Sequence, residues 1–172
     1  YAAAKAREIL GETPEKVDIL ASGNIIKNVK SVIVPNTNGM KGLKASVAIG
    51  IIGGNAAKEL EVIANVTEDE KQKTKEFLET TPMTITHINS QEQLDVTVKL
   101  YKDNHHASVR ISGFHTNIVY IQKDDTVLFE STTIGKPSAN LTDRSILSME
   151  GIYDFANKVE INDVKEILKR QL

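Results

Sequence analysis

The pattern of apolar and polar positions divides the chain into a helical first half and a strand-rich second half. Four early segments have the composition or the apolar content of helices, at residues 2–10, 43–52, 56–63 and 67–79. Gly11 and Gly53 follow two of them as helix stops, and Thr67 with Glu70 has the form of a capping box. Short apolar runs at residues 17–20 and 31–34 predict strands, the second of which ends at Pro35.

From Met83 onward the apolar period changes to two, which predicts strands. Leu94, Val96, Val98 and Leu100 alternate with Asp95, Thr97 and Lys99, a pattern typical of a half-buried strand with one solvated face. Turns at 103–104 and 123–125 join the following strands into an antiparallel meander. The fold class predicted is therefore α+β: an α/β sandwich with a mostly antiparallel sheet and helices on one face.

The last third of the chain predicts a loop followed by two helices. Residues 132–144 have the composition of a loop, and helices are expected at about 149–158 and 162–172, the second capped by Asn162. The first helix has no capping residue before it. In the last helix the apolar stripe continues to Leu172. We therefore expect a piece of a longer protein, with an α+β domain at 1–160 and the start of a linker helix at 161–172.

Composition narrows the function classes. The 172 residues carry a formal net charge of −2, which argues against a nucleic-acid-binding protein held by electrostatic attraction. Apolar runs are short and no signal peptide is visible, so we expect no membrane span and a cytoplasmic location. The chain has no cysteine, which removes thiolate ligands, disulfides and a cysteine nucleophile from these residues.

The loop at residues 35–42 is the first candidate site. Its candidate residues are Asn36, Thr37, Asn38 and Gly39. Asparagine and glycine are helix breakers, and placed before a helix they can expose backbone N–H groups that bind a carboxylate or phosphate. The order of residues matches neither a P-loop nor a dinucleotide fingerprint. The alternative is that they only form a turn between two elements.

The polar interruption at residues 112–117 is the second candidate. His115, Thr116 and Asn117 break two good strand patterns, and His115 could orient or protonate a bound carboxylate or hydroxyl. A bulge or a strand-to-strand turn is the alternative. Adjacent His105 and His106 point to opposite faces of a strand, so we predict no metal site in this chain.

Five blocks in order give the chain a resemblance to a known family. They are Tyr1-Ala2-Ala3-Ala4-Lys5-Ala6, Pro35-Asn36-Thr37-Asn38-Gly39-Met40-Lys41-Gly42, Ile51-Ile52-Gly53-Gly54-Asn55, Leu60-Glu61-Val62 and His115-Thr116-Asn117-Ile118-Val119. Together they resemble the N-terminal part of the L-cysteine desulfidase family, which is related to the bacterial iron–sulfur L-serine dehydratases. The resemblance covers essentially the whole chain, with Phe114 standing where a glycine is expected.

The resemblance implies an iron–sulfur lyase that removes the β-substituent of L-cysteine or L-serine and yields pyruvate, ammonia and sulfide or water. It implies a 4Fe–4S cluster bound by cysteines that acts as a Lewis acid. A Cys-Thr-Glu-Pro motif is expected just before Tyr1 and a cysteine-rich helical catalytic domain after Leu172. The present chain would then correspond to the β-chain-like domain of the serine dehydratases, which packs on the catalytic domain.

The resemblance leads to two hypotheses about the function of the chain. In the first, the chain belongs to a lyase of amino-acid catabolism. It is inactive by itself, because it has no cluster ligands. Residues 36–39 and 115–117 then provide polar contacts to a small amino-acid substrate. Its partner is then its own C-terminal catalytic domain. In the second, the chain is a non-catalytic module that senses an amino-acid effector or forms a homodimer.

Overall fold

The computed structural model describes residues 1–131 and 147–169, and the chain divides into two compact units, Tyr1–Lys136 and Pro137–Leu172. The boundary that the sequence analysis places near residue 160 stays a prediction. The loop predicted at 132–144 lies outside the described residues. Among the described residues, no helix combines the length and the hydropathy needed to cross a lipid bilayer.

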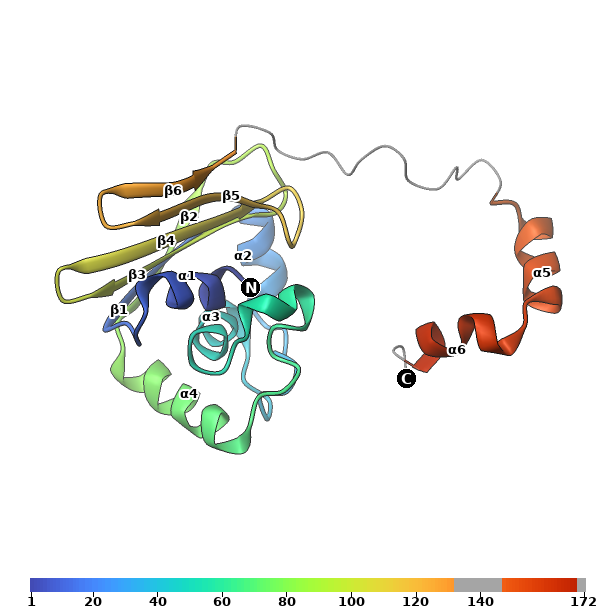
Figure 1. Ribbon diagram of the computed structural model, residues 1–172, viewed down its shortest axis with the longest axis horizontal. Coiled ribbons are helices and arrows are strands. Elements are labelled where there is room, and N and C mark those ends of the chain that lie inside the picture. The colour runs from blue at the N-terminus through green and yellow to red at the C-terminus, as the bar shows by residue number, and fades with distance from the viewer. Residues whose placement is uncertain (132–146, 170–172) are drawn as a thin grey trace. The chain divides into compact units, whose positions relative to one another are not determined.

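A six-stranded mixed sheet forms the centre of the first unit (Figure 1). Its order is β2-β1-β3-β4-β5-β6, in which β1 and β2 run parallel and every other neighbouring pair is antiparallel. Asp103 and Asp124 take the left-handed backbone conformation that tight two-residue hairpins require. The strands are β1 (Lys16–Ser22), β2 (Met83–Ile88), β3 (Asp95–Lys102), β4 (His105–Ser112), β5 (Ile118–Lys123) and β6 (Thr126–Glu130).

Helices pack against one face of this sheet. They are α1 (Ala2–Leu10), α2 (Gly23–Val29), α3 (Gly42–Ile52), the 3₁₀ helix η1 (Ala56–Glu61) and α4 (Glu68–Thr80). The alanine-rich α1 lies across β3 and β4 and also contacts α3, which in turn packs on α4 (Figure 1). Small side chains on α1 allow this close approach, and Ala6 is completely buried. The core therefore lies between α1, α3 and the inner face of β1, β3 and β4.

The period-two pattern identified the inner face correctly. Val98 and Leu100 face the core and pair across the strands with Val109 and Ala107. The predicted solvated face is wrong at one position, because Asp95 is completely buried. The charge of Asp95 is compensated by an arginine on β4, a contact between strands that alternation within one strand cannot reveal.

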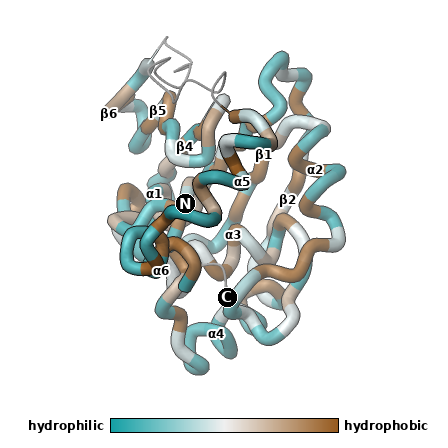
Figure 2. Tube along the Cα trace, turned by 90° about the vertical axis from the view of Figure 1, so that its right-hand side faces the viewer, coloured by the Kyte–Doolittle hydropathy of each residue, from teal (hydrophilic) through white to brown (hydrophobic). Residues whose placement is uncertain are grey.

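Local signals predicted most helix ends. Thr67 Oγ1 accepts a hydrogen bond from the backbone N–H of Glu70, and the Glu70 carboxylate accepts one from the N–H of Thr67, which completes the capping box of α4. Figure 2 shows α4 as mainly hydrophilic, consistent with a surface helix that buries only Thr74 and Phe77. Gly11 ends α1 with a left-handed φ of 93°.

One element prediction is wrong, and one helix was not predicted. Residues 31–34 form no strand, because Ile33 makes only an isolated bridge to Lys41. The helix α2 was missed, since its seven residues follow β1 directly and none of them is buried, so no apolar stripe marks it.

The second unit contains α5 (Met149–Lys158) and α6 (Ile161–Lys169). Ser148 Oγ accepts a hydrogen bond from Gly151 N–H and caps α5. Asn162 is not the cap of α6, because that helix begins at Ile161.

Candidate functional site

The loop before α3 has an unusual backbone. Asn36, Asn38, Gly39 and Gly42 have φ values of 57°, 54°, 88° and 86°, all in the left-handed region that asparagine and glycine tolerate best. Thr37 is buried and donates its hydroxyl to the Val34 carbonyl at 2.6 Å. The asparagines and glycines recognised in the sequence therefore form a tight turn.

Side chains of this loop hold it against the start of α4. Asn38 Nδ2 donates to Glu68 Oε2 at 2.9 Å, and Asn36 Nδ2 donates to the Ile63 carbonyl at 3.2 Å. The hydrogen bonds from Lys71 and Asn38 hold the pKa of the Glu68 carboxyl below its ordinary value. The amide donors of the two asparagines are thus engaged by the protein itself.

The second candidate segment forms the connection from β4 to β5. Asn117 Nδ2 donates to the Ser112 carbonyl at 2.8 Å, and Gly113 takes a left-handed φ of 80°. The strand pairing shifts register between Arg110 and Ile111, so a bulge lies beside this turn. Asn117 therefore has a structural role, whereas the side chains of His115 and Thr116 are exposed.

His115 lines a mainly apolar pocket of about 300 Å³. Its walls come from α1, α2, α3, η1 and the inner face of β3 and β4, with Tyr1 and Leu60 among the residues that face it. Three of the five sequence blocks thus meet here, although they are far apart in the chain. The residues from Asn36 to Gly39 do not line this pocket, so the two predicted halves of the site are not brought together in it.

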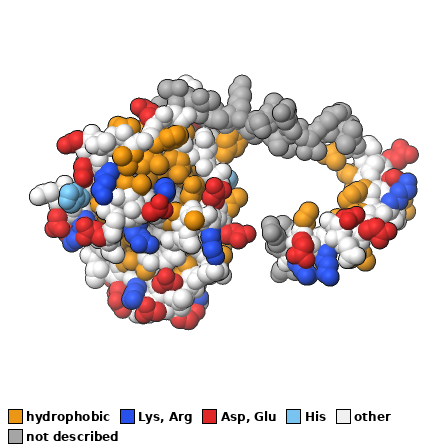
Figure 3. Space-filling model, in the orientation of Figure 1, with side chains coloured by type: hydrophobic (Ala, Val, Ile, Leu, Met, Phe, Trp, Pro, Cys, Tyr) orange, Lys and Arg blue, Asp and Glu red, His pale blue; other side chains and the backbone are white. Residues whose placement is uncertain are grey.

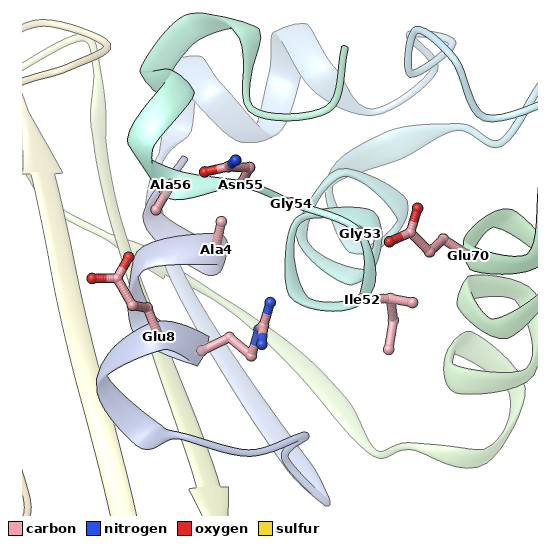
Figure 4. A pocket seen from close by; sticks show the side chains of 9 residues that line it. Ala4, Glu8, Ile52, Gly53, Gly54, Asn55, Ala56 and Glu70 are labelled. Carbon is pink, nitrogen blue, oxygen red and sulfur yellow. The ribbon is translucent and has the colours of Figure 1, made fainter. Parts of the chain in front are cut away.

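A second, more polar pocket of about 360 Å³ lies between α1, the end of α3 and α4 (Figure 4). It is lined by Ala4, Arg7, Glu8, Ile52, Gly53, Gly54, Asn55, Ala56 and Glu70. Glu8 and Glu70 lie on opposite sides of the Gly53–Gly54 segment (Figure 4). Arg7 could not be predicted as a pocket residue, because within a run of helix formers nothing in the sequence distinguishes it from a surface residue.

A third feature lies on the sheet face opposite the helices. The Arg110 guanidinium donates two hydrogen bonds, of 2.9 and 2.7 Å, to the buried carboxylate of Asp95. Ser90 Oγ donates a third to the same carboxylate at 2.7 Å. Arg110 also borders a shallow pocket of about 410 Å³ with Tyr120.

Metal ligands are scarce. The described residues contain no group of three or more His, Asp or Glu side chains placed to hold a metal ion, and the whole sequence has no cysteine. His105 Nδ1 lies 3.1 Å from Asp124 Oδ2, and the backbone N–H of His106 donates to Asp124 Oδ1 at 2.8 Å. These contacts, the bond from His106 first, lower the pKa of the Asp124 carboxyl and stabilise the hairpin turns.

Comparison with known proteins gives relatives that match nearly the whole chain. The chain is 45% identical over 172 residues to the UPF0597 protein of Desulfitobacterium hafniense, 43% identical over 175 residues to that of Treponema denticola and 36% identical over 171 residues to that of Aliivibrio fischeri. The alignments cover 98–100% of this chain but only 40% of each relative. No family model and no solved structure matches the chain.

Proposed function

We propose that the chain is the β-chain-like, N-terminal part of an iron–sulfur-dependent lyase that eliminates the β-substituent of L-cysteine or L-serine. One observation carries the proposal: the blocks at Tyr1–Ala6, Leu60–Val62 and His115–Val119, which make up much of the resemblance, contribute residues to one pocket. A shared pocket is the arrangement expected of residues that serve one site.

The residues of this chain do not fit the role of cluster ligands. With no cysteine and no grouped His, Asp or Glu ligands among the described residues, the chain offers nothing that matches thiolate coordination. The cluster would be held by residues outside these 172, and the relatives, of which this chain spans two fifths, are long enough to contain them.

The chain's own contribution to the reaction is to bind and orient the substrate. The apolar walls of the His115 pocket exclude water from one side, and His115 is the imidazole that faces it. An imidazole there can donate a hydrogen bond to a substrate carboxylate or accept a proton from its amino group. The loop at Asn36–Gly39 does not line this pocket, so its contact with the substrate stays a prediction from the sequence.

Changing His115 to alanine in the full-length, cluster-loaded protein should lower the rate of pyruvate formation at least tenfold, since the polar contact to the substrate is lost. His105→Ala is the matched control, because that imidazole is exposed beside Asp124 and does not line the pocket. Pyruvate release is measured anaerobically for both variants. Wild-type rates in His115→Ala would refute the role of this pocket in the reaction.

An exposed sheet edge favours the dimerisation module as a second candidate function. β6 is an edge strand of the sheet, and its Val127, Leu128 and Phe129 side chains are 48%, 53% and 46% exposed. Figure 2 shows β6 as hydrophobic, and Figure 3 shows hydrophobic side chains gathered over the end of the sheet where β5 and β6 lie. A second copy could pair with β6 across a two-fold axis and cover these side chains.

Light scattering of the 172-residue chain tests this candidate. We expect twice the mass of one chain for the native sequence and the mass of one chain for Phe129→Lys, because a lysine on each copy places two charges in the interface. Thr84→Lys, on the opposite edge strand β2, should leave the dimer intact. A monomeric native chain, or a dimer unaffected by Phe129→Lys, would exclude pairing through β6.

A further inference from the structure

The pocket between α1, α3 and α4 contains Arg7, whose side chain donates no hydrogen bond to the residues that the structure describes. Arg7 Nε is buried and has no hydrogen-bond partner among the described residues. No described carboxylate forms an ion pair with Arg7, although Glu8 and Glu70 line the same pocket. A buried donor on a charged group costs free energy unless a partner outside the chain satisfies it.

The neighbouring carboxylates are already engaged in ways that keep them on the pocket wall. Glu70 Oε2 accepts hydrogen bonds from both the N–H and the hydroxyl of Thr67 at 2.8 Å, which fixes its direction. Glu8 Oε1 accepts from Lys5 Nζ at 2.6 Å. Each carboxylate keeps a second oxygen free of these bonds, so the pocket offers one cationic group and two acceptors.

Two glycines let the chain at the end of α3 pack closely against the neighbouring walls of the pocket. A Cβ at Gly53 would lie 3.2–3.3 Å from atoms of Glu70 and Val66, and a Cβ at Gly54 would lie 2.3 Å from the Gly50 carbonyl oxygen. Larger residues at these positions would push these walls apart. Its volume of about 360 Å³ lies at the small end of the range for pockets that bind metabolites.

We propose that this pocket binds a small zwitterion, with the ligand's carboxylate against the Arg7 guanidinium and its ammonium group facing Glu8. A guanidinium matches a carboxylate with paired hydrogen bonds. The two glutamates disfavour a dianion such as phosphate, because the excess negative charge would be repelled. The inference goes beyond the proposed function, because neither His115 nor the loop at Asn36–Gly39 lines this pocket.

Titration of the 172-residue chain with L-alanine tests the assignment by calorimetry. L-Alanine has no β-leaving group, so its binding is independent of whether the lyase proposal holds. We expect saturable binding at millimolar concentration, and binding of acetate or ethylamine at least fivefold weaker, because each carries only one of the two charged groups. Arg7→Gln should weaken binding of L-alanine at least tenfold.

Two further variants complete the experiment. Lys58→Gln removes one exposed positive charge outside the pocket and should leave the affinity unchanged. Glu8→Gln should weaken binding of L-alanine and strengthen binding of acetate, an opposite response that a loss of folding could not produce. Absence of saturable binding, equal affinity in Arg7→Gln, or acetate binding as tightly as L-alanine would overturn the assignment.

Discussion

Replacing Arg110 by methionine should lower the free energy of unfolding by about 3 kcal/mol at pH 7, because the change leaves the charge of Asp95 buried without its partner. The Asp95 side chain is completely buried, and Arg110 supplies two of the three hydrogen bonds to its carboxylate. Ser90 alone cannot replace a guanidinium. Chemical denaturation followed by circular dichroism measures the difference.

The effect of this substitution should depend on pH with a defined sign. Burial by itself raises the pKa of the Asp95 carboxyl, but the hydrogen bonds from Arg110 and Ser90 outweigh it and lower the pKa below the ordinary value. In the native protein this contribution to stability is fully present above the pKa of unfolded aspartate, about 3.9, and is lost as the pH falls through the lower folded pKa.

In Arg110→Met the effect of burial is opposed only by the hydrogen bond from Ser90, so the pKa of Asp95 should rise and the carboxyl should take up a proton in mildly acidic solution. The loss of unfolding free energy relative to the native chain should therefore become smaller between pH 7 and about pH 4.5. Lys102→Met is the control, because the Lys102–Glu15 pair of 3.1 Å is solvent-screened and should contribute much less to the free energy of unfolding. The role given to the Arg110–Asp95 pair would be contradicted if Arg110→Met lost less unfolding free energy than Lys102→Met. It would also be contradicted if the loss in Arg110→Met became larger at acidic pH.

The sequence predicted elements best where the signal is local. The capping box at Thr67, the helix stop at Gly11 and the alternation from Val96 to Leu100 each depend on residues within one turn or one strand, and the structure confirms all three. The α+β class followed from these elements. The more specific likeness to a serine dehydratase β-chain stays a prediction.

Contacts between distant segments could not be predicted in the same way. The parallel pairing of β1 with β2 joins residues more than 60 positions apart, and no periodicity within either strand indicates it. The same limit explains why the sequence pattern places Asp95 on a solvated face, although its side chain is buried. It also explains why the buried Nε of Arg7 could not be predicted. Both depend on which charges the fold brings together, and that is a property of the assembled sheet and helices rather than of any one segment.

The candidate site shows this limit most clearly. His115 and the loop at Asn36–Gly39 were grouped because each interrupts a regular pattern, yet they occupy separate places in the structure. Interruption of a pattern marks a turn equally well, and Thr37, Asn38 and Asn117 all use their side chains to stabilise one. Only the three-dimensional arrangement indicates that His115, rather than its neighbours, faces a pocket.

Replacing Gly54 by alanine should destabilise the first unit by about 3 kcal/mol, because there is no room for a Cβ where the chain leaves α3. The new atom would lie 2.3 Å from the Gly50 carbonyl oxygen and 2.8 Å from Ala4 Cβ. Neither neighbour is the end of a flexible side chain, so relief requires the chain to leave α3 along a different path from Gly50 and α1 to move away from it. That movement would open the core around Ala4 and Gly50.

Gly53→Ala provides the matched control for this prediction in thermal and chemical denaturation. The added Cβ there would approach only side-chain atoms of Glu70 and Val66, at 3.2–3.3 Å, and Gly53 has an ordinary φ of −121°. We expect a change below about 1 kcal/mol, since those side chains can shift by a few tenths of an ångström. Equal destabilisation by the two substitutions would show that loss of glycine, rather than the close contact of α1 with the end of α3, determines the effect.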